Sequence, residues 1–341
     1  MKKAKILYNK RRKKKLTHLN INYLYLIIIL FILFIIIIII YKQFRNPDKP
    51  IHKITIDNIS EKKFEYFCCF CTLSRGENKY SRELISYYSQ IGVKKFIIGD
   101  NNLPNTEKFS DILQDYIKNG IVDIIDIKEK SIQQATFFGN VYEKYKTKCE
   151  WVTFFDFDEY LVMHFNENKK ITLKEYLSNG IFDKCEAILF NWLVYTDNDL
   201  VHYDNRTLLK RFTTPDLFSS DNIYVKSIVR GNINKRVFET GNTSHRPILE
   251  LNICDSMGKK IEFIEETLNP PRFKYAYIMH FSKKTAEEYA EKIKLGLIEH
   301  PETDIDSKIE EFFSLNKFTE EKLKVFETKF NRTFEKYHNN K

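Results

Sequence analysis

The sequence predicts an α/β domain with a mostly parallel central sheet, held outside the cytoplasm by an N-terminal membrane anchor. From residue 64 onward, apolar runs of strand length alternate with amphipathic stretches of helix length, a pattern typical of βαβ units. Before them, nine basic residues precede an uncharged apolar run. We therefore divide the chain into a basic cytoplasmic tail (1–20), a transmembrane helix (21–41), a stem (42–63), a domain of catalytic size (64–300) and a helical extension (301–341).

The predicted anchor is the uncharged run from Tyr23 to Tyr41, 19 residues long. As a helix rising ~1.5 Å per residue it would cover ~28 Å, about one hydrocarbon thickness. A cleaved signal peptide is the alternative, but its apolar region is shorter, roughly 7 to 15 residues, and ends in small residues rather than in a sequence such as KQFRNPDKP. Because the basic residues precede the span, the positive-inside rule places the N-terminus in the cytoplasm. We expect a single-pass type II protein of a Golgi or secretory-pathway membrane, with the bacterial inner membrane as the alternative.

The formal net charge of +9 is located in the tail. With its nine basic residues set aside, the rest of the chain holds equal numbers of basic and acidic residues. A surface for nucleic acid is therefore not expected.

The six cysteines show no spacing typical of a zinc site. They are at positions 68, 69, 71, 149, 185 and 254. We interpret them as buried thiols, because three lie in an apolar strand-like run, although an extracytoplasmic compartment would permit disulfides.

The predicted elements follow one another in regular order. Strands are expected within residues 64–73, 93–102, 121–127 and 149–157, the second of these ranges including the turn that follows its strand. Helices are expected at 81–92, 107–120 and 132–145, the first two closed by Gly92 and Gly120. A short helix (172–180), an apolar strand (187–195) and a long polar loop come next. The C-terminal residues carry an apolar helical stripe that indicates docking onto the domain.

Polar side chains follow three of the predicted strands. They are Arg75, Glu77 and Asn78, then Asp100, Asn101 and Asn102, then Asp156, Asp158 and Glu159. Because ligands bind outside the carboxyl ends of parallel strands, we expect these side chains to share one rim of the sheet.

The sequence WVTFFDFDEYL places three carboxylates directly after a buried strand. Carboxylates this close repel one another unless a cation joins them or water reaches them, and Mg²⁺ or Mn²⁺ with a diphosphate ligand would meet that need. A solvated strand end followed by a helix start is one alternative. A phosphatase of the haloacid-dehalogenase type is another, but Tyr160 stands where its motif has Thr or Val. The carboxylates therefore favour a metal-dependent transferase that uses a nucleotide sugar.

Several blocks, in this order along the chain, resemble glycosyltransferase family 92 and its DUF23-type relatives. They are CTLSRGENKYSRELISYYSQIGVKKFIIGDNN, QDYIKNGIVDII, WVTFFDFDEYL, NWLVYTDNDL, VKSIVRGN, SHRP and YIMHFSKKTAEEYAEKIKLG, within residues 66–296. The resemblance implies a GT-A fold and a metal-dependent transfer of a hexose, with galactose favoured and inversion expected, from a UDP-sugar to a glycan or glycoprotein acceptor. A catalytically inactive sugar-binding relative of the same fold is the alternative.

The resemblance also implies roles for individual residues. Glu77, Asn78 and Asp100 would face the nucleotide, and Asp156 and Asp158 would hold the metal and the donor diphosphate. Lys226 and Arg230 are candidate diphosphate contacts.

The metal shell and the general base complete the predicted site. Either His245 or His280 would complete the metal shell. We assign the general base to Asp197, with Glu159 second, although a turn role for Asp197 is equally compatible with its sequence. Glu159 is also compatible with an orienting role or with a helix start. Trp192 is expected in the core or the pocket wall rather than as a sugar platform.

Overall fold

The computed structural model describes residues 64–127, 133–164, 171–239, 243–262, 266–296 and 304–338. The predicted tail, anchor and stem lie outside the described residues. Within that described part, no helix is both long and apolar enough to span a bilayer.

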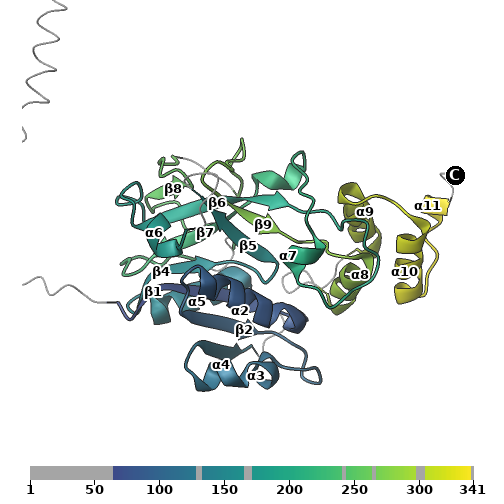
Figure 1. The fold of residues 1–341 in the computed structure, drawn as a ribbon, viewed down its shortest axis with the longest axis horizontal. Helices are drawn as coiled ribbons and strands as arrows, with labels where there is room; N and C mark the ends of the chain where they lie inside the picture. The colour runs from purple at the N-terminus through teal and green to yellow at the C-terminus, as the bar shows by residue number, and fades with distance from the viewer. Residues whose placement is uncertain are drawn as a thin grey trace, which may run out of the picture. The chain divides into compact units, whose positions relative to one another are not determined.

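The described residues form a mixed sheet in the order β3-β2-β1-β4-β7-β6-β9-β5, with β8 paired to β6 (Figure 1). The strands are β1 Tyr66–Ser74, β2 Lys95–Asp100, β3 Val122–Asp126, β4 Cys149–Phe154, β5 Glu159–Met163, β6 Ala187–Val194, β7 Val225–Arg230, β8 Ile253–Asp255 and β9 Ala276–His280. Pairing is parallel from β3 through β4 and between β6 and both β8 and β9. It is antiparallel where β7 joins β4 to β6 and where β5 joins β9. The expected α/β fold with a mostly parallel sheet is confirmed.

The helices of the first half lie between strands, as the alternation predicts. They are the 3₁₀ helix η1 Asn78–Tyr80, then α2 Ser81–Gln90, α3 Phe109–Ile112, α4 Gln114–Lys118, α5 Gln134–Tyr145 and α6 Leu173–Leu177. The single helix expected at 107–120 is thus two short helices, which meet at Leu113.

The second half adds shorter helices and a C-terminal group. They are α7 Leu208–Arg211, the 3₁₀ helix η2 Ser220–Ile223, α8 Ala286–Leu295, α9 Ile305–Leu315, α10 Glu320–Phe330 and α11 Glu335–His338.

Both faces of the sheet are covered, because alternate residues of a strand point to opposite sides. In β1, Cys68 and Phe70 belong to the cluster that contains Leu84 and Tyr88 of α2. Cys69, Cys71 and Leu73 belong instead to the cluster that contains Phe137 and Phe138 of α5. This double cover explains why the strands read as continuous apolar runs.

The chain directly after β4 differs from expectation in a way that matters for the site. The acids after the fourth strand lie in a tight turn, and Glu159 opens strand β5 rather than a helix. Strand β5 then pairs with β9, setting Glu159 opposite His280. The turn is thereby enclosed by a later part of the chain.

The prediction of buried thiols is correct for two cysteines and wrong for four. Cys68 and Cys71 are free and buried. Cys69 is bonded to Cys149 and Cys185 to Cys254, over sequence separations of 80 and 69 residues. The reason is tertiary: β1 lies beside β4, which brings the Cα atoms of Cys69 and Cys149 to 5.9 Å.

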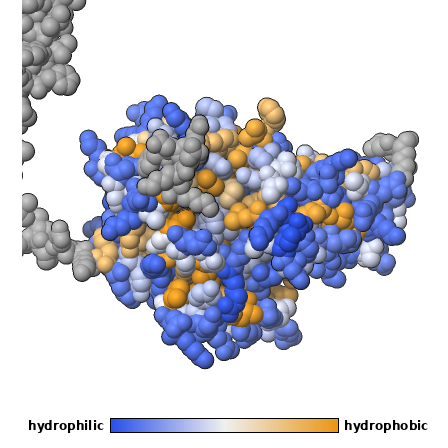
Figure 2. Space-filling view, viewed as in Figure 1, coloured by the Kyte–Doolittle hydropathy of each residue, from blue (hydrophilic) through white to orange (hydrophobic). Residues whose placement is uncertain are grey.

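The C-terminal helices pack on α8. The stripe residues Leu323, Phe326 and Phe334 share one apolar cluster with Tyr289 and Ile293 of α8, as the predicted docking requires. The surface of the C-terminal helices that faces the viewer in Figure 2 is largely hydrophilic. Helix α8 therefore connects the sheet to the C-terminal helices.

Candidate active site

A cavity of about 350 Å³ opens at the carboxyl ends of β1 and β4. Its wall includes the loop after β1, the turn after β4, part of β6 and β7, and much of α8 and the segment before it. Six of the eleven residues assigned a catalytic, binding or metal role line it, and so do Arg75 and Trp192; the six are Glu77, Asp156, Asp158, Lys226, His245 and His280. Part of the predicted ligand rim, namely the loop after β1 and the turn after β4, thus lies in a cavity wall.

Apolar anchors and a reciprocal hydrogen bond shape the turn that carries Asp156 and Asp158. The rings of Phe155 and Phe157 are buried in the core, so the aspartates between and after them project from a fixed backbone. The backbone N–H of Asp156 donates to Glu159 Oε2 at 2.9 Å, and the N–H of Glu159 donates to the carbonyl of Asp156 at 3.2 Å. Glu159 is therefore part of the framework of the turn.

Asp156 has two side-chain partners. Lys226 Nζ lies 2.7 Å from Oδ2, and the amide of Gln134 donates to Oδ1 at 2.6 Å. Lys226, the second residue of β7, is itself buried. Burial alone would lower the pKa of Lys226, but the negative charges of Asp156 and Glu159 raise it above its ordinary value.

Asp158 lies beside two lysines and a histidine. Its Oδ2 lies 3.2 Å from Lys284 Nζ and 3.4 Å from Lys292 Nζ, while His280 Nε2 lies 3.7 Å from Oδ1. Burial would raise the pKa of Asp158, but the charges of Lys284 and Lys292 outweigh it and hold the pKa far below its ordinary value. Asp158 is therefore ionised and already neutralised by this chain.

The pKa values of Glu159 and Glu77 are raised, whereas that of Asp158 is lowered. Burial, with the negative charges of Asp156 and Asp158 added, raises the pKa of Glu159 well above its ordinary value despite Lys226. Burial likewise raises the pKa of Glu77, although Lys284 opposes the effect at 2.9 Å.

The two candidate histidines flank Trp192. The ring of Trp192 lies 4.0 Å from that of His280 and 5.2 Å from that of His245, centroid to centroid. Burial lowers the pKa of His280 to about 3 and that of His245 to about 4, so both rings are neutral at pH 7. Trp192 lines the cavity, as the pocket-wall prediction states.

Five predicted residues lie outside the cavity lining: Asn78, Asp100, Glu159, Asp197 and Arg230. Asp100 accepts hydrogen bonds from the backbone of Asn102 and Phe109, and Asn78 accepts one from the Asn102 amide at 2.8 Å. Asn78 and Asp100 therefore shape the loops beside the cavity.

Arg230 and Asp197 contact other parts of the fold. Arg230 donates to the carbonyls of Cys185 and Phe182, with its guanidinium 4.1 Å from the Trp151 ring. Asp197 lies 2.6 Å from Lys322 of α10, and both side chains are buried. The structure thus gives no support to Asp197 or Glu159 as the base, or to Arg230 as a diphosphate contact, and these roles stay predictions.

The predicted metal ligands do not converge on one point. In the described residues, no group of three or more His, Cys, Asp and Glu side chains could hold a metal ion. Ammonium groups from Lys226, Lys284 and Lys292 occupy the positions beside the aspartates. The arrangement as folded does not fit a divalent ion, which needs several free oxygen ligands.

Sequence reasoning missed the lysines that follow β9. Lys283, Lys284 and Lys292 all line the cavity, yet they belong to a segment more than 100 residues from the aspartates. Lys283 and Lys284 belong to the block MHFSKKT, in which only the histidine was assigned a role, and Lys292 follows in the same family-like segment.

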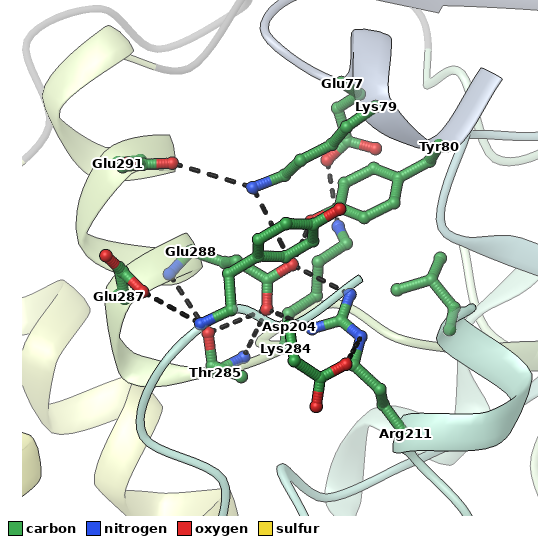
Figure 3. Close-up of polar contacts among 12 residues, drawn as sticks. Glu77, Lys79, Tyr80, Asp204, Arg211, Lys284, Thr285, Glu287, Glu288 and Glu291 are labelled. Carbon is green, nitrogen blue, oxygen red and sulfur yellow. Dashed lines mark hydrogen bonds and ion pairs between the residues drawn. The ribbon is translucent and has the colours of Figure 1, made fainter. Parts of the chain in front are cut away.

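A buried ion pair holds this segment against the rest of the wall. Arg211 of α7 makes two hydrogen bonds to Glu288 of α8, at 2.6 and 2.9 Å, and the hydroxyl of Tyr80 donates to the same carboxylate. Lys79 reaches Glu288 and Glu291 from the opposite side (Figure 3). Hydrogen bonds to Glu288 therefore tie the loop after β1 and helix α7 to α8.

Solved structures of S. aureus TarS show a distant likeness to this chain. Residues 1–349 of TarS align at a TM-score of 0.31 with 13% identity, covering 80% of this chain and 73% of that one. The same TarS region in complex with UDP-GlcNAc aligns at 0.34 with 13% identity, covering 79% and 72%. At TM-scores this low, we infer nothing about the function of this chain from TarS.

Curated relatives match a shorter segment. A glycosyltransferase family 92 protein of Oryza sativa subsp. japonica is 34% identical over 113 residues, which is 33% of this chain and 18% of the relative. One of Ricinus communis is 28% identical over 120 residues, 33% of this chain and 20% of the relative. The matched segments thus span about a fifth of these relatives' length. The sequence model named glycosyltransferase family 92 matches residues 64–336, which is most of the chain. The chain therefore belongs to glycosyltransferase family 92.

Proposed function

We propose that this protein transfers a sugar from a UDP-sugar to a glycan or glycoprotein acceptor. The observation that carries the proposal is the family 92 match, because it spans the residues that build the cavity at the carboxyl ends of β1 and β4. A cavity at this rim is where an α/β sheet of parallel strands binds its ligands. We take the domain to have a GT-A arrangement.

In the proposed reaction an acceptor hydroxyl attacks the anomeric carbon of the donor sugar. The bond from that carbon to the β-phosphate oxygen breaks, and UDP leaves with the electron pair. The acceptor proton passes to a carboxylate or to water. The chain's own contribution is to hold the diphosphate beside cationic groups, which offset the charge that develops on the leaving group.

The finer parts of the proposal concern the sugar and the stereochemistry. We place a hexose in the donor, with galactose tested first, and expect inversion at the anomeric carbon. Proton NMR of the product gives the anomeric configuration from its coupling constant. A retained configuration would contradict inversion without affecting the transfer itself.

The requirement for Mn²⁺ or Mg²⁺ stays a prediction. Lysines, rather than free space for an ion, lie beside the two aspartates. The predicted anchor and type II orientation stay part of the proposal. The two disulfides support an extracytoplasmic domain, because such bonds persist in oxidising compartments.

The test uses the full-length chain, purified in mild detergent. Each UDP- and GDP-hexose is incubated with and without glycan acceptors, once in Mn²⁺ and once in EDTA, and the released nucleotide is measured. Release from a UDP-hexose in either condition supports the proposal. If no donor is turned over, the protein is the inactive sugar-binding relative instead.

A further inference from the structure

The cavity already contains the positive charge that a divalent ion would bring. Lys284 and Lys292 both lie within 3.4 Å of Asp158 Oδ2, and Lys226 lies 2.7 Å from Asp156 Oδ2. A divalent ion would have to displace these ammonium groups before the aspartates could coordinate it. A diphosphate, in contrast, is attracted by the same groups.

The backbone at Lys284 indicates that this position is built for its side chain. Its φ is +52°, in the left-handed region that residues other than glycine rarely adopt, and its side chain is 4% exposed. Its ammonium lies 2.9 Å from Glu77 (Figure 3). The same ammonium lies 3.2 Å from Asp158. The next residue, Thr285, caps α8 through a capping box with Glu288. The conformation is therefore held from both sides.

Lys292 reaches the same carboxylate from the middle of α8. Its side chain is 37% exposed and lines the cavity, so its ammonium can move from Asp158 to a bound ligand without a change in the fold. The segment from Lys284 to Lys292 thus presents one fixed and one movable ammonium group to a single cavity.

We propose that Lys284 and Lys292 bind the diphosphate of the donor and do the work of a divalent cation in this protein. The proposal rests on the UDP-sugar transfer proposed above. Asp158 is then a positioning residue: it gathers two ammonium groups and can neutralise one of them, leaving positive charge for the phosphates. As UDP leaves, both ammonium groups face the charge that develops on it.

Calorimetry of the full-length chain with UDP, in EDTA and again in Mn²⁺, tests the proposal without any variant. We expect UDP to bind in EDTA with a Kd within about threefold of the value in Mn²⁺, because the lysines already supply the positive charge. A threefold change in Kd corresponds to about one RT of binding free energy. Binding that vanishes in EDTA and returns with Mn²⁺ overturns the lysine proposal and leaves the UDP-sugar transferase intact. Absence of UDP binding in both conditions overturns the transferase proposal and this inference with it.

Lysine variants test which groups contact the phosphates. Lys292→Met should weaken UDP binding about tenfold, the size expected for one charge-assisted hydrogen bond, and should leave binding of uridine, followed by NMR, unchanged. Lys294→Met is the matched control, because Lys294 is exposed on the same helix and does not line the cavity. Equal losses for UDP and uridine, or none for either, would overturn the proposal.

Lys284→Met should show the same selective loss of UDP binding. Because this change leaves Glu77 and Asp158 buried beside a methyl group, the variant can fail to fold. In that event Lys292→Met and the EDTA experiment still decide the question.

Discussion

Asp158 differs from an ordinary metal ligand in having two ammonium partners, and a change that removes only its charge can expose the difference. In Asp158→Asn both lysines lose the Asp158 charge and Lys284 keeps Glu77 as its partner, so the cavity becomes more positive. We expect UDP binding in EDTA to be kept or tightened, measured by calorimetry. Asp126→Asn, at an exposed carboxylate, serves as the control. Weaker UDP binding together with a lost response to Mn²⁺ would make Asp158 a metal ligand.

Asp197 offers a second test at the residue scale, because its burial against Lys322 indicates a structural role. Asp197→Asn and Lys322→Met should each destabilise the fold, by roughly 3 kcal/mol for the lysine change, since each leaves a buried partner without its counter-charge. Turnover per folded molecule should not change. Denaturant unfolding and donor hydrolysis are measured side by side. Abolished turnover in a folded Asp197→Asn would instead establish it as the base.

At the scale of elements, Glu288 holds α8 in place. Burial would raise the pKa of Glu288, but the hydrogen bonds from Arg211, Tyr80 and Thr285 and the charge of Arg211 lower it to about 2. A carboxylate whose pKa is lowered on folding adds stability above its unfolded pKa near 4.5 and loses it as the pH falls toward 2. The contribution at pH 7 is on the order of 3 kcal/mol.

Glu288→Gln should therefore lower the free energy of unfolding at pH 7 and flatten its decline between pH 4.5 and 2, followed by urea titration at each pH. Glu291→Gln, on the same helix with a half-exposed side chain, should change stability by less than about 1 kcal/mol. If the free energy of unfolding of Glu288→Gln fell between pH 4.5 and 2 as steeply as that of the wild type, the ion pair of Glu288 with Arg211 would not cause the decline.

The disulfide between Cys185 and Cys254 joins the start of β6 to β8. Replacing both residues by Ser should cost about 2–4 kcal/mol of unfolding free energy, because the bond closes a loop of 69 residues in the unfolded chain. Thermal unfolding gives the loss, and peptide mapping without reductant shows both bridges in the wild type. Free thiols at these positions in protein isolated from its native source without reductant would contradict the pairing.

At the scale of the whole molecule, the proposed anchor would determine the compartment in which the enzyme works. We expect the full chain to stay in the membrane pellet after carbonate extraction, with the domain protected from protease in sealed vesicles. Deleting residues 21–41 should release it. Protease sensitivity of the domain in sealed vesicles, with the tail protected, would reverse the proposed orientation.

The sequence by itself predicted the βαβ order, the rim and the Asp156–Phe157–Asp158 turn. These follow from local periodicity and from the rule that parallel strands end at one edge, which need no knowledge of distant contacts. The docking of the C-terminal helices could also be predicted from the sequence, because the apolar stripe of an amphipathic helix packs against another part of the protein.

Only the tertiary structure decided which charges meet. Lys284 and Lys292 follow Asp158 by more than 100 residues and reach it because β9 pairs with β5 and sends the chain back past the turn. The disulfide of Cys69 and Cys149 and the pair of Asp197 and Lys322 arise in the same way. Such contacts depend on how the elements are arranged in space, and a single sequence does not encode that arrangement in its local pattern. Sequence alone thus determined the acidic half of the site, and folding supplied the lysines that neutralise it.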